Sequence, residues 1–411
     1  MERDDLCAWL RLTLTPGIGN AATRRLLQAF GLPQAIFQQT SFALQQCVTA
    51  AQAQALLQEP AGLAALLTTT WQWLHAARPE TAHTPARALL ALGDAQYPSL
   101  LLETEDPPPL LYLLGAARFL APDAEPFPRG TCLAIVGSRH PTAQGEGNAR
   151  EFARALRATG MTIVSGLALG VDAAAHEGAL ASAQDSDHTP ATLAIVGTGL
   201  DRVYPRSHLP LAHRIAAHGL LVSEYPLGTP PLPGNFPKRN RIIAGLSQGT
   251  LVVEAAPASG SLITARLASE QGREVFAIPG SIHAPQSRGC HALIRQGAKL
   301  VETAQDVLEE LRLSSPSALT PPLGKAVGRS KRTPPSPTSN PSLIPLPQQQ
   351  SLDAPDSPLL QALGYDPAGL DALQARTGLA TATLQVELLE LELAGAVARL
   401  PGGLFQRMGR G

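Results

Sequence analysis

The sequence predicts an α/β protein whose core is a doubly wound, parallel sheet, with a smaller domain on either side of it. Two observations predict this class. Six short apolar runs, separated by helical patterns, follow one another between residues 129 and 312. Two Pro-rich segments then divide this core from Leu- and Ala-rich flanks. Apolar strands that alternate with helices are typical of a parallel sheet covered on both faces.

The composition restricts the classes of protein to which the chain can belong. The chain has 411 residues, of which 44% are hydrophobic and 16% are charged, which suits two or three folded domains. Lys and Arg total 32 against 33 Asp and Glu, so the formal net charge is −1. A globally basic surface for a polyanion is therefore excluded, and any nucleic acid has to be held by a localised group of cations.

The cysteine spacing and the N-terminal residues indicate the cellular compartment of the protein. Cys7, Cys47, Cys132 and Cys290 are widely spaced and form no C-x-x-C pair, so we expect free thiols and no metal site. The first residues are acidic, and no run of about eighteen apolar residues occurs. We expect a soluble cytoplasmic protein without a membrane segment.

Two breaks in composition divide the chain. Residues 121–128 are rich in Pro, and residues 313–357 are crowded with Pro, Ser and Thr, which predicts an extended linker. The predicted units are an N-terminal helical domain over residues 1–120, a Rossmann-like domain over 129–312 and a winged-helix domain over 358–411.

The N-terminal unit has Leu and Ala at helical spacing and few β-branched runs, so we expect a small helical bundle. Its turn, Pro16-Gly17-Ile18-Gly19, precedes a helix expected over residues 21–30. This arrangement resembles a SAM-like or helix-hairpin-helix element, in which backbone N–H groups face a phosphate. A tight turn between two packed helices explains the same glycines, and the sequence leaves both interpretations open.

The middle unit alternates strands with helices. Strands are expected at residues 133–136, 161–164, 192–196, 219–222, 250–253 and 274–278. In a doubly wound sheet of this kind, ligands bind at the carboxyl ends of the strands.

The last unit shows a helix, a turn, a second helix and a hairpin, and it resembles a winged helix. The second helix, expected over residues 381–393, carries Glu387, Glu390 and Glu392 and neither Lys nor Arg. An acidic helix suits a phosphate-lined groove poorly, so we expect a protein-contact or regulatory role for this domain.

Four loops rich in Gly and Ser follow predicted strands, at residues 137–139, 165–172, 197–199 and 258–264. Small residues let backbone N–H groups and helix starts face an anion. Each loop alone equally suits a tight strand-to-helix turn, but four of them at one sheet edge predict a phosphate pocket. The residues assigned to this pocket are Gly137, Ser138, Arg139, Ser165, Gly166, Ser259, Gly260 and Ser261.

A basic helix start adds to this pocket. Lys238, Arg239, Asn240 and Arg241 lie within one helical turn, where the helix dipole disfavours cations unless an anion is bound. The cluster therefore predicts a phosphate contact, and a solvated cationic helix start is the alternative. Phe236, just before it, offers a ring for base stacking or a hydrophobic plug under the loop, and the sequence leaves both open.

Catalytic interpretations are weaker. Asp172, His176, Glu224 and Glu254 lie near strand ends, where a general acid–base pair is conceivable. Asp172 more simply caps its helix, and His176 packs on it. The sequence has no G-x-S-x-G, Walker A or H-E-x-x-H motif, and the third glycine of a dinucleotide fingerprint is missing after Gly199. We predict no catalytic residue, no metal and no cofactor.

Five stretches of the middle unit resemble the bacterial DNA-processing A family, also called DprA/Smf. They run in family order: Ile135–Arg139, Ser165–Asp172, Phe236–Ser247, Ser259–Ala265 and Ile278–Gly280. The string from Arg239 to Ser247 is the most specific of them. The N-terminal and C-terminal units resemble the family only in the arrangement of their domains along the chain.

The resemblance implies a non-enzymatic protein that binds single-stranded DNA during natural transformation. It implies protection of that strand and loading of the RecA recombinase in the presence of single-strand-binding protein. It also implies a homodimer formed through the Rossmann-like domain. Carried over by position, Arg139 and the Lys238, Arg239 and Arg241 cluster bind phosphates, and Gly166 and Ser259–Ser261 line the pocket.

Two other functions compete with this one. The first is a nucleotide enzyme, because nucleoside monophosphate hydrolases share the Rossmann-like fold. They resemble a Pro-Gly-Gly-x-Gly-Thr-x-x-Glu pattern, whereas the corresponding loop here, Ala258–Thr264, has no glutamate. The second is a scaffold whose pocket binds a regulatory nucleotide. Release of base from a nucleoside monophosphate separates the enzyme from both binding functions.

Overall fold

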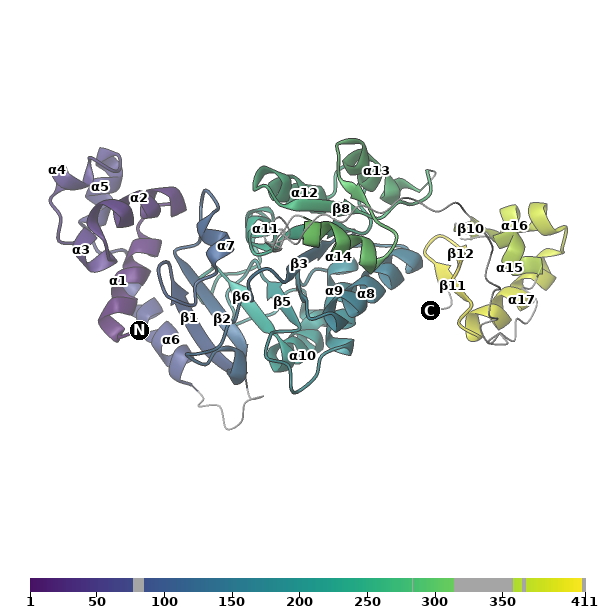
Figure 1. The fold of residues 1–411 in the computed structure, drawn as a ribbon, viewed down its shortest axis with the longest axis horizontal. Coiled ribbons are helices and arrows are strands. Elements are labelled where there is room, and N and C mark those ends of the chain that lie inside the picture. Colours follow the sequence, from purple (N-terminus) through teal and green to yellow (C-terminus); the bar gives the residue numbers. More distant parts are fainter. Residues whose placement is uncertain (77–84, 283, 314–357, 364–366, 409–411) are drawn as a thin grey trace, which may run out of the picture. The chain divides into compact units, whose positions relative to one another are not determined.

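The computed structural model describes residues 1–76, 85–282, 284–313, 358–363 and 367–408. Two compact units make up the chain, Met1–Leu311 and Arg312–Gly411 (Figure 1). Apart from its first residue, the linker predicted over 313–357 lies outside the described residues.

The first unit is built on one nine-stranded sheet of order β1-β2-β6-β5-β4-β3-β7-β8-β9. The strands are β1 (Pro85–Ala91), β2 (Leu110–Ala116), β3 (Cys132–Val136), β4 (Thr162–Ser165), β5 (Thr192–Ile195), β6 (Leu220–Ser223), β7 (Gly249–Val252), β8 (Glu274–Ala277) and β9 (Lys299–Leu300). From β6 to β9 all neighbours are parallel. The six predicted strands are confirmed, and the doubly wound core with them. Chain order reverses between β3 and β7, which is where such sheets bind ligands.

One part of the helical prediction is wrong. Residues 85–116 contain β1 and β2, which pair antiparallel with each other and extend the sheet beyond β6. The helices before them do form, as α1 (Arg3–Leu14), α2 (Asn20–Phe30), α3 (Pro33–Ile36), α4 (Ser41–Leu44), α5 (Ala50–Leu56) and α6 (Leu63–His75). The segments at 85–91 and 110–116 are rich in Ala and Leu, which favour helices, but pairing of β1 with β2 and of β2 with β6 overrides that local preference.

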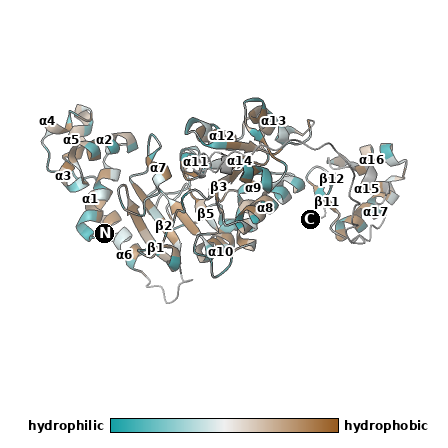
Figure 2. Ribbon diagram, in the orientation of Figure 1, coloured by the Kyte–Doolittle hydropathy of each residue, from teal (hydrophilic) through white to brown (hydrophobic). Residues whose placement is uncertain are grey.

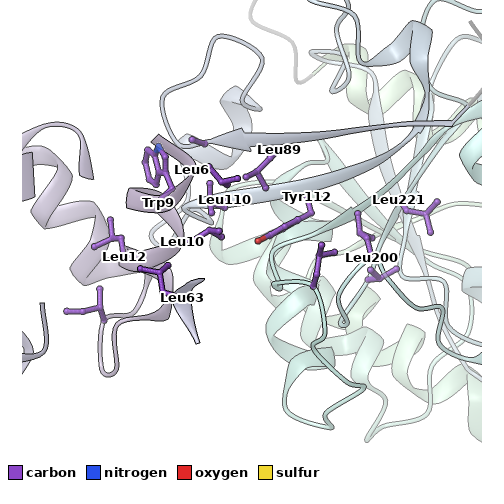
Figure 3. Packing of buried hydrophobic residues seen from close by; sticks show 14 of the residues in the cluster. Leu6, Trp9, Leu10, Leu12, Leu63, Leu89, Leu110, Tyr112, Leu200 and Leu221 are labelled. Carbon is purple, nitrogen blue, oxygen red and sulfur yellow. The ribbon is translucent and has the colours of Figure 1, made fainter. Parts of the chain in front are cut away.

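A shared hydrophobic core joins the N-terminal helices to the sheet. Leu6 and Trp9 of α1 belong to the same buried cluster as Leu110 and Tyr112 of β2 and Leu221 of β6 (Figure 3). The N-terminal helices therefore share one hydrophobic core with the sheet.

Helices cover both faces of the parallel strands. They are α7 (Ser99–Leu102), α8 (Ala143–Ala158), α9 (Val171–Ala181), α10 (Leu209–His218), α11 (Asn235–Gly245), α12 (Gly260–Glu270), α13 (Arg288–Arg295) and α14 (Ala304–Leu313), with short 3-10 turns at Ala117–Phe119, Arg206–His208 and Pro285–Ser287. Leu133 and Ile135 of β3 belong to the cluster under α8 and α9, whereas Ala134 and Val136 belong to the one under α11. The strand is thus buried on both faces, which is why it reads as an unbroken apolar run. Figure 2 shows the contrast between the hydrophobic strands and more hydrophilic residues on outer helices such as α8.

The second unit has the predicted winged-helix arrangement. Its elements are α15 (Pro358–Leu363), β10 (Ala368–Gly369), α16 (Leu370–Thr377), α17 (Thr381–Leu393), β11 (Val397–Leu400) and β12 (Leu404–Arg407). The three strands form an antiparallel sheet of order β10-β12-β11, with the hairpin turning at Gly402 and Gly403. Within the described residues, no helix is long and apolar enough to cross a membrane.

A buried arginine holds the polar loop between α9 and β5. Arg157 is 4% exposed, and its guanidinium lies 2.6 Å from the Asp187 carboxylate and donates to Thr189 Oγ1 at 3.1 Å and to the Thr189 carbonyl at 3.2 Å. The loop is thus tied to the end of α8 by one side chain with several partners.

We expect Arg157→Leu to lower the free energy of unfolding by about 2–3 kcal/mol, because several charge-assisted hydrogen bonds are lost at a buried position. Urea unfolding followed by circular dichroism measures this. Arg154→Leu on the same helix is the control, since the Arg154–Glu151 pair is exposed and its loss should leave the free energy of unfolding almost unchanged. Equal losses in the two variants would contradict the assignment.

Candidate functional site

A cavity of about 450 Å³ lies at the carboxyl ends of β3 and β7, where the strand order reverses. Most of the predicted pocket residues line it. They are Gly137, Ser138, Arg139, Phe236, Arg239, Asn240, Ser259, Gly260 and Ser261. Loops that are more than 100 residues apart in the chain therefore meet at one place, as the topology of a doubly wound sheet requires.

The start of α12 forms one wall. Ser259 is the N-cap, and its hydroxyl accepts from the Ser261 N–H at 3.3 Å and lies 2.7 Å from the Ser261 hydroxyl. Asn240 of α11 donates to the Gly260 carbonyl at 3.3 Å, which fixes the two helices at this point. The N–H groups at this end of α12 and its dipole favour an anion in the cavity.

The loop after β3 forms the opposite wall. A Cβ at Gly137 would lie 2.7 Å from Val171 and 2.9 Å from the Glu254 carbonyl, so only glycine fits there. The Glu254 carboxylate accepts from the Thr142 N–H at 2.9 Å and from its hydroxyl at 2.6 Å, which anchors the far end of the loop. Burial raises the pKa of Glu254, and these two hydrogen bonds oppose that rise. Between the two anchors, Arg139 is exposed.

Arg239 lies at the bottom of the cavity and is only 4% exposed. Its guanidinium donates to the Ile195 carbonyl, and its Nε has no hydrogen-bond partner. Burial lowers the pKa of Arg239, Asp172 opposes this, and the nearby charge of Arg139 lowers it further. Arg139 and Arg239 therefore both line one cavity, and their positive charges favour an anionic ligand there.

The turn after β4 supports Arg239 from below. A Cβ at Gly166 would lie 1.9 Å from Arg239 Nη1, so the guanidinium occupies space that only glycine leaves free. Asp172 accepts from the Gly166 and Ala168 N–H groups at 3.1 and 3.4 Å. Ser165 donates to the Ile135 carbonyl at 2.7 Å. Ser165 and Gly166 thus do not line the cavity. Gly166 leaves room for Arg239, and Ser165 ties the end of β4 to β3.

The other two cations of the cluster lie away from the cavity. The Arg241 guanidinium pairs with the Glu224 carboxylate and, at 3.1 Å, with Asp106, and the residue is 8% exposed. Lys238 is exposed, and its ammonium lies 6.0 Å from the Tyr225 ring centroid, on the side that faces Asn20. Of the three predicted phosphate-binding cations on α11, only Arg239 lines the cavity.

An aromatic contact at the rim was not expected from the sequence. Tyr204, 49% exposed in the loop after β5, lies beside Phe236 with ring centroids 5.5 Å apart. The Phe236 ring also packs over Gly197, where an added Cβ would lie 3.1 Å from it. Phe236 therefore packs against the loop after β5, and it also lines the cavity.

The conceivable acid–base residues are all engaged in internal contacts. His176 is fully buried, its Nδ1 lies 2.7 Å from the Thr192 hydroxyl, and burial lowers its pKa to about 3. Asp172 holds backbone N–H groups, Glu224 pairs with Arg241, and Glu254 holds Thr142. Across the described part of the chain, no group of three His, Cys, Asp or Glu could hold a metal ion.

The fold and cavity define a Rossmann-like protein with a localised cationic site at the reversal of the sheet, followed by a winged helix. The family model described as DNA recombination-mediator protein A matches residues 88–312, and the model described as DprA winged helix domain matches residues 344–403. The chain belongs to the DNA recombination-mediator protein A family.

Individual relatives agree with this membership. Protein Smf of Escherichia coli strain K12 is 41% identical over 320 residues, which cover 78% of this chain and 77% of the relative. DNA processing protein DprA of Streptococcus pneumoniae strain R6 is 46% identical over 217 residues, which cover 53% of this chain and 72% of the relative. The X-ray structure of DNA processing protein A from Streptococcus pneumoniae superposes with a TM-score of 0.59 at 35% identity, covering 75% of this chain and 98% of that one.

The contacts of Arg241 predict a structural role. Arg241→Met should lower the free energy of unfolding by about 3–5 kcal/mol, because Glu224, with a side chain 5% exposed, is left charged and unpaired. Urea unfolding measures the loss, and Arg139→Met at an exposed position is the control, with an expected change of about 0.5 kcal/mol or less. An Arg241→Met variant as stable as the parent would show that the pair does not hold the fold.

Proposed function

We propose that this protein binds single-stranded DNA through the cavity between β3 and β7 and acts as a recombination mediator during natural transformation. The meeting of Arg139, Arg239 and the N-terminal end of α12 at one cavity carries the proposal. A phosphate there is attracted to the charges of Arg139 and Arg239 and to the N-terminal end of α12.

The shape of the site favours a single strand over a duplex. The chain has a net charge of −1, so it lacks the broad basic surface that would follow the two phosphate rows of duplex DNA. The cavity of about 450 Å³ admits a phosphate and its neighbouring groups rather than a double helix. Phe236 at the cavity supplies an aromatic ring, and only an unpaired base exposes its face for stacking.

Family membership extends the proposal to the partners. We propose that the bound strand is shielded from nucleases and passed to the RecA recombinase in the presence of single-strand-binding protein. We further propose that the chain acts in the cytoplasm as a homodimer, which would repeat the small cationic cavity and so lengthen the contact with DNA.

A nucleoside monophosphate hydrolase remains the alternative function, because the cavity suits any phosphate. Two observations speak against it. The loop at Ala258–Thr264 has no carboxylate, and Asp172, His176 and Glu254 are already held by internal hydrogen bonds. Incubation with nucleoside monophosphates, followed by chromatography, tests it, and release of free base would favour the hydrolase.

We expect Arg139→Ala to weaken binding of a single-stranded oligonucleotide about tenfold or more, because a charge-assisted phosphate contact is worth about 1.5–3 kcal/mol. The slope of log affinity against log salt should become shallower by about 0.7 for the lost phosphate contact. Fluorescence anisotropy at several salt concentrations measures both quantities, with single and double strands compared.

Two further variants sharpen this test. Lys238→Ala should weaken binding less than Arg139→Ala, because Lys238 lies outside the cavity. Arg154→Ala, which removes an exposed cation paired with Glu151, should leave affinity and salt slope unchanged. Unchanged affinity in Arg139→Ala, or an equal loss in all three variants, would sink the assignment of the cavity.

A further inference from the structure

The helix α17 of the winged-helix unit has two apolar faces. Leu384 and Leu388 are 0% and 1% exposed and belong to the core of the unit. Val386, Leu389 and Leu393 are instead 58%, 55% and 81% exposed. An ordinary surface helix has one apolar face, turned to the core, so the second face calls for an explanation.

The exposed residues form a continuous stripe along α17. With Ala382, which is also exposed, they are spaced by four, three and four residues, which places all of them on one side of a helix. The same periodicity places Leu384 and Leu388 on the opposite side. We call Ala382, Val386, Leu389 and Leu393 the apolar stripe. Its spacing is that of the contact seam between two packed helices.

Carboxylates flank the apolar stripe. The helical periodicity places Glu390 on one side of it and Glu392 on the other, and Glu387 lies beyond Glu390. The helix carries no Lys or Arg. This charge disfavours a DNA phosphate backbone as the occupant. It also disfavours α17 of a second copy, because the acidic flanks of two such helices would face each other.

We propose that the apolar stripe is a docking surface for an amphipathic helix of a partner protein, whose apolar residues are flanked by Lys and Arg. The partner's apolar residues fill the spaces between Val386, Leu389 and Leu393, and its cations pair with Glu390 and Glu392. Helix-on-helix recognition of this kind takes its affinity from the apolar contacts and its choice of partner from the flanking charges.

A pair of synthetic helical peptides tests the proposal on the full chain. Both carry Leu at the seam positions, and they differ only in having Lys or Glu at the flanking positions. Fluorescence anisotropy should show tenfold or tighter binding of the Lys-flanked peptide. The double variant Glu390→Lys, Glu392→Lys should reverse this preference, and Leu389→Asp should remove binding of both peptides. Because the substituted residues are exposed or half-buried, circular dichroism should show the parental fold.

A control on the same helix separates the stripe from charge alone. Thr383→Asp adds a negative charge at an exposed position off the stripe, so it should preserve or strengthen binding of the Lys-flanked peptide. Three results would overturn the proposal. They are equal binding of the two peptides, an unchanged preference after the charge reversal, and no binding of either peptide. Self-association that Leu389→Asp abolishes, without peptide binding, would assign the stripe to a second copy instead.

Discussion

The candidate site depends on one buried cation. Placing the Arg239 guanidinium under the sheet reversal costs hydration free energy, which the Ile195 carbonyl and the charge of Asp172 offset in part. Its position requires Gly166, because any side chain there would occupy the space of the guanidinium. The cavity therefore has one arginine fixed in its lining and a second, Arg139, exposed on the loop after β3.

The rest of the first unit keeps α11, and therefore Arg239, in place. Arg241 ties α11 to Glu224 after β6 and to Asp106 before β2. From the N-terminal helices, Asn20 donates to the Asp106 carbonyl at 3.3 Å and Arg24 to the Thr104 carbonyl at 2.8 Å. The added strands β1 and β2 thus do more than widen the sheet, because they carry the segment that joins the N-terminal helices to α11.

The sequence predicted the parts of the fold that have a local signal. The six central strands were predictable because burial on both faces makes each of them an unbroken apolar run. The antiparallel pair β1 and β2 was not predictable, since Ala and Leu favour helices. Only pairing within the sheet, of β1 with β2 and of β2 with β6, makes these segments strands. The loops of the cavity were predictable from topology. The sequence did not predict which of Lys238, Arg239 and Arg241 lines the cavity. Neighbouring helix positions point in different directions, and the buried face of the helix was unknown. The contact of Tyr204 with Phe236 could not be predicted from the sequence, because the two residues are distant in the chain.

The near-zero net charge of the chain conceals local groups of like charge. The cations that matter for an anion are concentrated at the cavity of the first unit, and α17 of the second unit carries carboxylates alone. A polyanion is repelled from the apolar stripe, whereas a helix rich in Lys and Arg is repelled from Arg139 and Arg239. On the two proposals above, the cavity and the apolar stripe therefore select ligands of opposite charge.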